Sequence, residues 1–224
     1  MNTSETPHLR PALELLERQG FHATSVDELA AALGMSRSTF FRRYGTKEAV
    51  VFSDQEAIVA MAQQLILQVD PSATLGERLT VVRDVVLQIF ERFTADRESA
   101  AIRYRLVREV EELKDRELVG THRFERVFRT FLDTSKRDHD AAARATSVGF
   151  AAAVVAVHND HFRRWLRDFS DDHRGELALA VDAVLARFMP ATDPHVPAAS
   201  GTGTDANKLY SAEEVLEIVR KALS

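Results

Sequence analysis

Apolar residues recur along most of the chain at steps of three and four, which is the spacing of one face of an α-helix. The clearest case is the segment 75–93, in which six apolar residues alternate these two steps. No sustained alternation of apolar and polar residues occurs, and no Asn-Gly or Asp-Gly pair indicates a β-hairpin. The pattern therefore predicts an all-α protein.

Two short helices joined by a glycine turn are predicted near the N-terminus. Ser25 and Glu28 form a capping box that starts the first helix, whose apolar residues share one face as far as Gly34. Ser36 is a natural N-cap for a second helix that reaches about Tyr44. Two short helices around a tight turn with glycine are typical of a helix-turn-helix, although a plain helical hairpin would give the same local pattern.

Further signals divide the chain into long helices and two less regular ends. Pro11 cannot lie deep inside a helix, so the first helix is expected to start near Leu9, after a disordered arm. The stretch 190–208 holds three of the six prolines and is expected to be a flexible linker. Later helices are predicted at 47–69, 75–93, 98–110, around 124–131, 140–167 and 172–189. The expected parts are an arm at 1–8, a helix-turn-helix domain at 9–46, a larger helical domain at 47–189, a linker at 190–208 and an amphipathic helix at 209–224.

The net charge of −5 is distributed unevenly along the chain. The segment 34–47 carries Arg37, Arg42, Arg43 and Lys47 and no acidic residue, whereas the rest of the chain is acidic overall. A solvated helix face usually mixes both signs of charge. A compact basic patch on the second short helix therefore favours an edge that binds phosphate.

Several other classes of function find no support in the sequence. Cysteine is absent, and no glycine-rich phosphate loop or Gly-x-Ser-x-Gly elbow occurs, so we expect neither an enzyme nor a cofactor. His158 and His161 lie three residues apart, but no further histidine or cysteine stands at a convincing spacing for a metal site. The longest apolar run, 148–157, has ten residues, whereas a membrane span needs about 20. No signal peptide is recognisable, so we expect a cytoplasmic protein without membrane contact.

The N-terminal segment resembles the DNA-binding domain of the TetR family of transcriptional regulators. The resemblance covers residues 9–52 and rests on the stretches 12–21, 23–30 and 34–48, which span three helices with both turns in register. It implies a helix-turn-helix domain followed by a helical domain that binds a ligand and dimerises. It also implies a repressor that a small-molecule effector releases from a palindromic double-stranded DNA operator. The sequence leaves open a DNA-binding regulator that is controlled by a protein partner.

The resemblance implies that the helix from Ser36 to Tyr44 reads the major groove of DNA. Phe41 stands where the family usually has tyrosine, and Arg43 where it often has histidine. Phe41 cannot donate a phenolic hydrogen bond to phosphate, whereas Arg43 adds a full charge. Arginine matches guanine, and hydroxyl groups and cations near a helix N-terminus bind phosphate. The expected DNA-contacting residues are Thr24, Ser36, Arg37, Ser38, Thr39, Phe41, Arg42, Arg43 and Lys47.

Aromatic residues gather in the larger domain, where nine of the 13 phenylalanines lie between Phe90 and Phe188. Ligand pockets are mostly apolar with a few polar groups, although each of these rings could instead belong to the core. Arg103 and Arg105 flank Tyr104 and could hold an anionic head group, or could be solvated surface residues. The expected ligand-binding residues are Phe90, Phe93, Arg103, Tyr104, Phe124, Phe128, Phe131, His158, Phe162 and Trp165.

A homodimer is expected to form through the helices 140–167 and 172–189. The first of these is rich in alanine, and small residues allow two backbones to approach closely; high helix propensity is the other explanation. A two-fold dimer reads two half-sites about one turn of DNA apart. The helix at 209–224 is expected either to cover a groove on a sensor domain or to fray as a tail.

Overall fold

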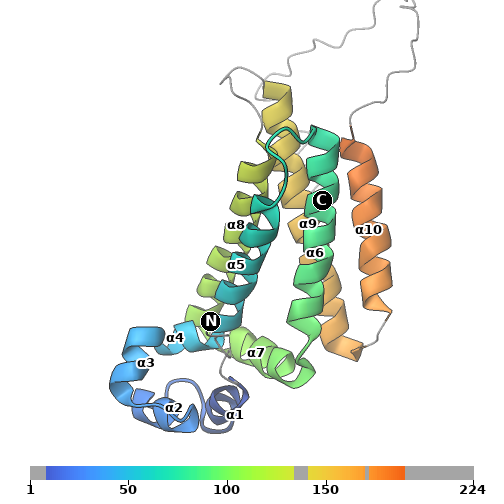
Figure 1. Ribbon diagram of the computed structural model, residues 1–224. Coiled ribbons are helices and arrows are strands. Elements are labelled where there is room, and N and C mark those ends of the chain that lie inside the picture. The colour runs from blue at the N-terminus through green and yellow to red at the C-terminus, as the bar shows by residue number, and fades with distance from the viewer. Residues whose placement is uncertain (1–8, 134–140, 170–171, 190–224) are drawn as a thin grey trace, which may run out of the picture. The chain divides into compact units, whose positions relative to one another are not determined.

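The computed structural model describes residues 9–133, 141–169 and 172–189, and within these ranges every regular element is an α-helix (Figure 1). The fold is therefore all-α, as predicted, while the expected arm, linker and C-terminal helix lie outside the described residues. The helices are α1 (Arg10–Gln19), α2 (Val26–Ala32), α3 (Arg37–Arg43), α4 (Lys47–Val51), α5 (Ser53–Leu67), α6 (Leu75–Thr94), α7 (Arg97–Glu109), α8 (Glu111–Leu132), α9 (Ala141–Asp168) and α10 (His173–Phe188).

Helices α1, α2 and α3 form the predicted helix-turn-helix domain, and local caps decide where α2 and α3 begin. Ser25 Oγ accepts a hydrogen bond from the Glu28 amide at 3.2 Å, and the Ser25 amide donates to the Glu28 carboxylate at 2.8 Å. Gly34, with a φ of 65°, supplies the left-handed turn before α3. Ser36 Oγ then accepts a hydrogen bond from the Thr39 amide at 3.2 Å and caps α3.

The prediction of one helix from residue 47 to 69 is wrong, because the helix is broken at Phe52 into α4 and α5. Phe52 has a φ of −110° and a ψ of 11°, away from helical values. The amide of Gln55 donates to the Phe52 carbonyl rather than to Val51. The Val51 carbonyl accepts instead from Arg103 Nε at 2.7 Å. A side chain distant in sequence therefore stabilises the break.

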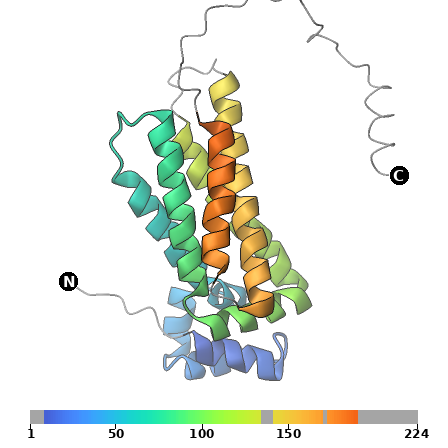
Figure 2. The same cartoon turned by 90° about the vertical axis from the view of Figure 1, so that its right-hand side faces the viewer.

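Helices α5, α6, α8, α9 and α10 lie lengthwise beside one another, and α7 crosses the end of this bundle that is nearer to α1 (Figures 1 and 2). Their apolar faces enclose a core of aliphatic and aromatic side chains, in which Phe128 and Phe150 are almost fully buried. Helix α8 begins at Glu111, so the helix predicted around 124–131 is the C-terminal half of a longer one.

Helix α7 connects the two halves of the described structure through ion pairs with α1. Arg10 of α1 donates to Asp96, the N-cap of α7, at 2.7 Å. Arg105 of α7 donates to Glu17 of α1 at 2.5 Å. Leu106 and other α7 residues complete the apolar core beneath α1. A displacement of α7 would therefore also move α1 of the helix-turn-helix domain.

Helices α9 and α10 correspond to the two helices predicted at 140–167 and 172–189. By length and composition alone α9 could cross a membrane, but Phe150, Val154 and Trp165 pack into the core of the bundle. The two helices approach closely at Gly149, where an added Cβ would lie 3.1 Å from the ring of Phe188. The small residue at Gly149 thus allows α9 to pack closely against α10 within one chain.

Candidate DNA-binding surface and ligand pocket

The outer surface of α3 presents hydroxyl groups and cations to solvent. Ser36, Ser38, Arg42 and Arg43 are exposed, and Thr39 is partly exposed. Arg42 and Arg43 form no ion pair with any residue that the structure describes. Both guanidinium groups can therefore reach phosphate or base edges without first breaking a salt bridge.

Arg37, at the start of α3, has partners within the protein. Its Nη1 donates to Asp27 Oδ2 on α2 at 2.6 Å, and its guanidinium lies 5.4 Å from the centre of the Phe41 ring. The Arg37 and Asp27 side chains are 62% and 60% exposed, so this ion pair contributes little to stability and can be exchanged for DNA. Phe41 is itself 42% exposed, and the face of its ring attracts the guanidinium of Arg37.

Two expected DNA contacts are engaged inside the protein. Thr24 is 1% exposed and its hydroxyl donates to the Gly20 carbonyl at 2.8 Å, which argues against a contact between that hydroxyl and phosphate. Lys47 Nζ donates to the carbonyls of Phe21 at 2.8 Å and Thr24 at 3.1 Å. Lys47 therefore fastens the start of α4 to the turn between α1 and α2. An ammonium group has three donors, so a phosphate contact from the third stays a prediction.

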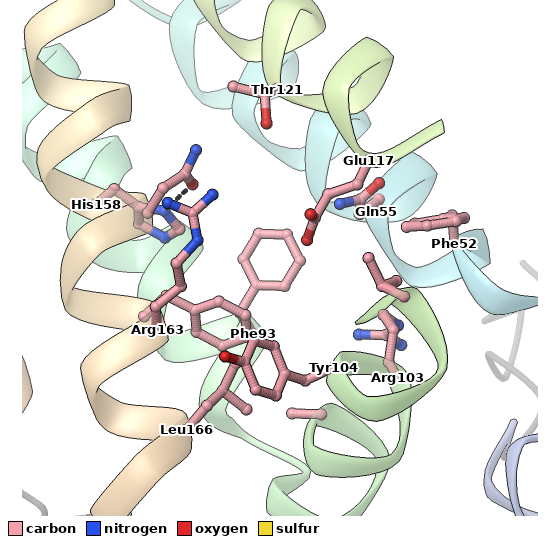
Figure 3. Close-up of a pocket in the computed structure, with 14 residues that line it drawn as sticks. Phe52, Gln55, Phe93, Arg103, Tyr104, Glu117, Thr121, His158, Arg163 and Leu166 are labelled. Carbon is pink, nitrogen blue, oxygen red and sulfur yellow. Dashed lines mark hydrogen bonds between the residues drawn. The ribbon is translucent and has the colours of Figure 1, made fainter. Parts of the chain in front are cut away.

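A cavity lies between α5, α7, α8 and α9, at the end of the bundle near α7 (Figure 3). The cavity has a volume of about 60 Å³, which is room for a few water molecules. A second cavity of about 40 Å³ adjoins it, shares Phe93 and His158 with it, and has walls of Val86, Ile89 and Phe128. The residues lining the first cavity are Phe52, Gln55, Phe93, Ala100, Arg103, Tyr104, Val107, Glu117, Thr121, His158, Asn159, Phe162, Arg163 and Leu166.

The structure brings seven of the ten expected ligand-binding residues to these two cavities, and whether they bind a ligand stays a prediction. Phe90 does not line either cavity. Its ring meets the ring of His158 edge-on, with the ring centres 5.8 Å apart. Trp165 stacks on Phe162, and the centres of the two rings lie 5.8 Å apart. Phe131 lines a surface groove between α5 and α8 instead. The seven residues that line a cavity are Phe93, Arg103, Tyr104, Phe124, Phe128, His158 and Phe162.

Three further polar residues of the wall were not expected from the sequence, because no apolar pattern marks them. Gln55, Glu117 and Thr121 face the cavity, and burial raises the pKa of the Glu117 carboxyl. One signal could have found two of them. Glu117, Thr121, Phe124 and Phe128 follow one another at steps of four, three and four, which places all four on one face of α8.

His158 lies buried among the rings of Phe90, Phe93 and Phe162. Burial lowers the pKa of His158 to about 4, so the ring is neutral at physiological pH. Its Nδ1 lies 3.1 Å from Asn159 Oδ1, while Nε2 is buried and has no hydrogen-bond partner among the described residues. Because Asn159 Oδ1 can only accept, Nδ1 carries the proton and Nε2 is an unused acceptor.

The arginines that were expected to hold an anionic head group have other partners. Arg103 Nε donates to the Val51 carbonyl and its Nη2 to Asp54 Oδ2, both at 2.7 Å, while Arg105 is exposed and paired with Glu17. Arg103 therefore lines the cavity and at the same time holds the junction between α4 and α5. Within the described residues no group of three or more potential ligands is placed to bind a metal ion.

Sequence comparisons relate the chain to known regulators. The model of the bacterial regulatory proteins of the tetR family matches residues 9–53. A Mycobacterium tuberculosis protein, provisionally assigned as the mycofactocin biosynthesis transcriptional regulator MftR, is 28% identical over 189 residues, which are 82% of this chain and 91% of that protein. YerO of Bacillus subtilis, an uncharacterised HTH-type transcriptional regulator, is 24% identical over 93 residues, which are 42% of this chain and 32% of YerO.

A comparison of structures extends the similarity beyond the N-terminal domain. Native NalD, the secondary repressor of the MexAB-OprM multidrug efflux pump in Pseudomonas aeruginosa, aligns with a TM-score of 0.53 and 18% identity. The alignment covers 80% of this chain and 93% of NalD, so the fold is shared across both domains. The N-terminal helix-turn-helix, residues 9–53, therefore matches the tetR family of bacterial regulatory proteins, and the helical bundle behind it shares the fold of NalD.

Proposed function

We propose that the protein is a cytoplasmic, dimeric repressor that a small, largely apolar ligand releases from a palindromic operator. One observation carries the proposal: Phe52 and Gln55, at the start of α5, form part of the wall of a cavity that is small. A ligand must push such walls apart in order to enter. The start of α5 follows directly on α4, which is fastened to the helix-turn-helix domain by Lys47.

The DNA-binding part of the proposal rests on the surface of α3. Arg42 and Arg43 are exposed without an ion-pair partner among the described residues, and Arg37 has only an exposed one. We assign Arg37 and Arg42 to base edges and Arg43 to phosphate, because arginine makes bidentate contacts with guanine. Both curated relatives carry the name of transcriptional regulator, which supports this role.

The dimeric part of the proposal rests on two exposed apolar stripes. Val148, Ala152 and Ala156 follow one another along α9 at steps of four, and Leu179 and Ala183 do so on α10, which packs beside α9. All five side chains are exposed in the single chain, and Leu179 is 74% exposed. Two neighbouring helices with small apolar faces would form a four-helix interface with a second copy.

The repressive step follows from reciprocal coupling between the two sites. Ligand in the pocket shifts the start of α5 and Arg103, so α4 and the attached helix-turn-helix domain take a new position in each subunit. The spacing of the two α3 helices then no longer matches the operator. A coupling of about 1–3 kcal/mol changes the affinity for DNA roughly 5–150-fold.

Retardation of a palindromic promoter fragment by the purified dimer tests the DNA-binding assignment. The triple variant Arg37→Ala, Arg42→Ala and Arg43→Ala should lose sequence-selective binding, because base and phosphate contacts of α3 are removed together. Wild-type affinity should fall steeply with salt as phosphate contacts release counterions. Thermal unfolding of the variant must match the wild type, so that loss of binding reports on contacts.

A matched control removes the same charge from a different surface. Arg92 of α6 and Arg126 and Arg129 of α8 are exposed, and replacing all three by alanine should leave operator selectivity intact. Equal loss in the control variant would mean that net charge, and not the α3 surface, carries binding. Selective binding by the α3 variant would contradict the assignment outright.

A further inference from the structure

Glu117 is an acidic residue of the pocket wall, and its carboxylate forms no hydrogen bond or ion pair among the described residues. It comes from α8, is partly buried, and points into the space lined by the other labelled residues (Figure 3). No described residue forms a hydrogen bond or an ion pair with its carboxylate. Burial raises the pKa of Glu117, with the charge of Arg163 opposing this effect. A carboxylate in such a place is stabilised by any cation that enters.

A second group of the wall also calls for a hydrogen-bond donor. His158 Nε2 is a buried acceptor that has no hydrogen-bond partner in the part of the chain that the structure describes, and the ring is neutral because burial lowers its pKa to about 4. His158 lies on α9, across the cavity from α8, and it lines both the first and the second cavity. Two elements therefore present unused acceptors to the same space.

Neither arginine of the wall forms a hydrogen bond with Glu117 or with His158 Nε2. Arg103 is occupied by the Val51 carbonyl and by Asp54, as described above. Arg163 lines the cavity and its charge acts on Glu117, but its side chain is exposed, so solvent and salt screen this attraction. An anionic ligand would thus meet one solvated arginine, and it would have to approach the carboxylate of Glu117.

The remaining walls suit an apolar body attached to a cation. The rings of Phe93, Tyr104 and Phe162 line the first cavity, and aromatic faces attract cations. The second cavity adds Val86, Ile89 and aromatic rings of α8, so it offers an apolar recess behind the acceptors.

We propose that the pocket binds a hydrophobic amine, whose protonated nitrogen pairs with Glu117 and whose apolar body enters the recess behind Phe93. This inference rests on the proposed function in that it takes the cavity to be the sensor site. A cationic group thus takes the place of the anionic head group that the sequence suggested. Arg103 and Arg105, which were expected to hold the anionic group, bond other residues of the protein.

A trio of matched probes tests the charge preference with the wild-type dimer. Phenylpropylamine, phenylpropanol and phenylpropionate share one body and differ in a cationic, neutral or anionic end. Isothermal titration calorimetry at neutral pH should show the amine binding at least about tenfold more tightly than the alcohol, since a hydrogen bond to a charged group is stronger than a neutral one. The carboxylate should bind least. An alcohol or carboxylate that binds as tightly as the amine would overturn the proposal, and so would the failure of all three to bind.

Glu117→Gln tests the residue while keeping the shape of the side chain. The variant should lose the preference for amine over alcohol, with little change in the affinity for the alcohol. Asp115→Asn is the matched control, because Asp115 is exposed on the same helix and its loss removes the same charge. Retention of the full preference in Glu117→Gln, or an equal loss in Asp115→Asn, would overturn the assignment.

The titrations contain no DNA, so they are independent of the repressor assignment. If the protein binds its operator but prefers no amine, the inference fails while the proposed function stands. If the amine binds as expected but leaves operator affinity unchanged, the pocket chemistry stands and the proposed release mechanism fails.

Discussion

Arg103 offers the sharpest test of how the pocket and the DNA-binding domain are joined. Its guanidinium, on a side chain only 10% exposed, bonds the Val51 carbonyl and Asp54 at the break between α4 and α5. Arg103→Met keeps most of the apolar stem and removes both hydrogen bonds. The Val51 carbonyl then has no donor at a helix end, and Asp54 loses its partner.

The size of the effect follows from the burial of the two partners. Removing one member of a fully buried pair costs about 3–5 kcal/mol. The Asp54 side chain is 32% exposed and can be partly rehydrated, so we expect a loss of about 2–3 kcal/mol in the free energy of unfolding. For a protein of this size that corresponds to a fall in Tm of roughly 5–10 °C.

Thermal unfolding at a fixed dimer concentration measures this loss, and Arg105→Met is the matched control. Arg105 lies two residues further along α7, but its ion pair with Glu17 joins side chains that are 52% and 37% exposed. Such a surface pair contributes at most about 1 kcal/mol. If Arg103→Met were no more destabilising than Arg105→Met, the hydrogen bonds of Arg103 would not hold the junction, and the coupling route through them would be refuted.

Three further predictions concern the caps, the dimer and the buried histidine. Ser25→Ala should lower stability by about 1 kcal/mol through loss of the capping box, and unchanged denaturant unfolding would contradict this. Leu179→Glu should convert the dimer to monomers in analytical ultracentrifugation, whereas Leu67→Glu, at an equally exposed position of α5, should not; dissociation of both or neither would count against the α10 interface. Because the pKa of His158 is lowered from 6.5 to about 4 in the folded state, the unfolded chain binds a proton first as the pH falls. Stability should therefore decrease by roughly 3 kcal/mol between these pH values, and His158→Phe should remove that slope while a substitution of the exposed His122 should not.

The sequence could predict those features of the fold that short stretches decide. Ser25 and Ser36 start α2 and α3 because the residues that they cap lie only three positions away. The break at Phe52 could not be found in this way. It depends on a hydrogen bond from Arg103, a residue of another helix that reaches the Val51 carbonyl only after the chain has folded.

The sequence predicted the aromatic rings of the pocket together with Arg103 and His158, but not its other polar residues, for a related reason. Phenylalanine content points to walls such as Phe93 and Phe162, but the same residue type also fills the core, as Phe90 does. Polar residues that face a cavity cannot be told from polar residues that face solvent by their type alone. Glu117 became recognisable as a pocket residue once α8 was known to begin before it.

The junction at Phe52 also explains how a small displacement could reach DNA. A continuous helix from residue 47 to 67 would carry motion along its axis as one rigid body. The break instead leaves α4 as a short helix held from two sides, by Arg103 at its end and by Lys47 at its start. Lys47 bonds two carbonyls of the turn between α1 and α2, so α4 cannot shift without moving that turn. The same lysine that the sequence assigned to phosphate would therefore take part in the proposed coupling between the pocket and α3.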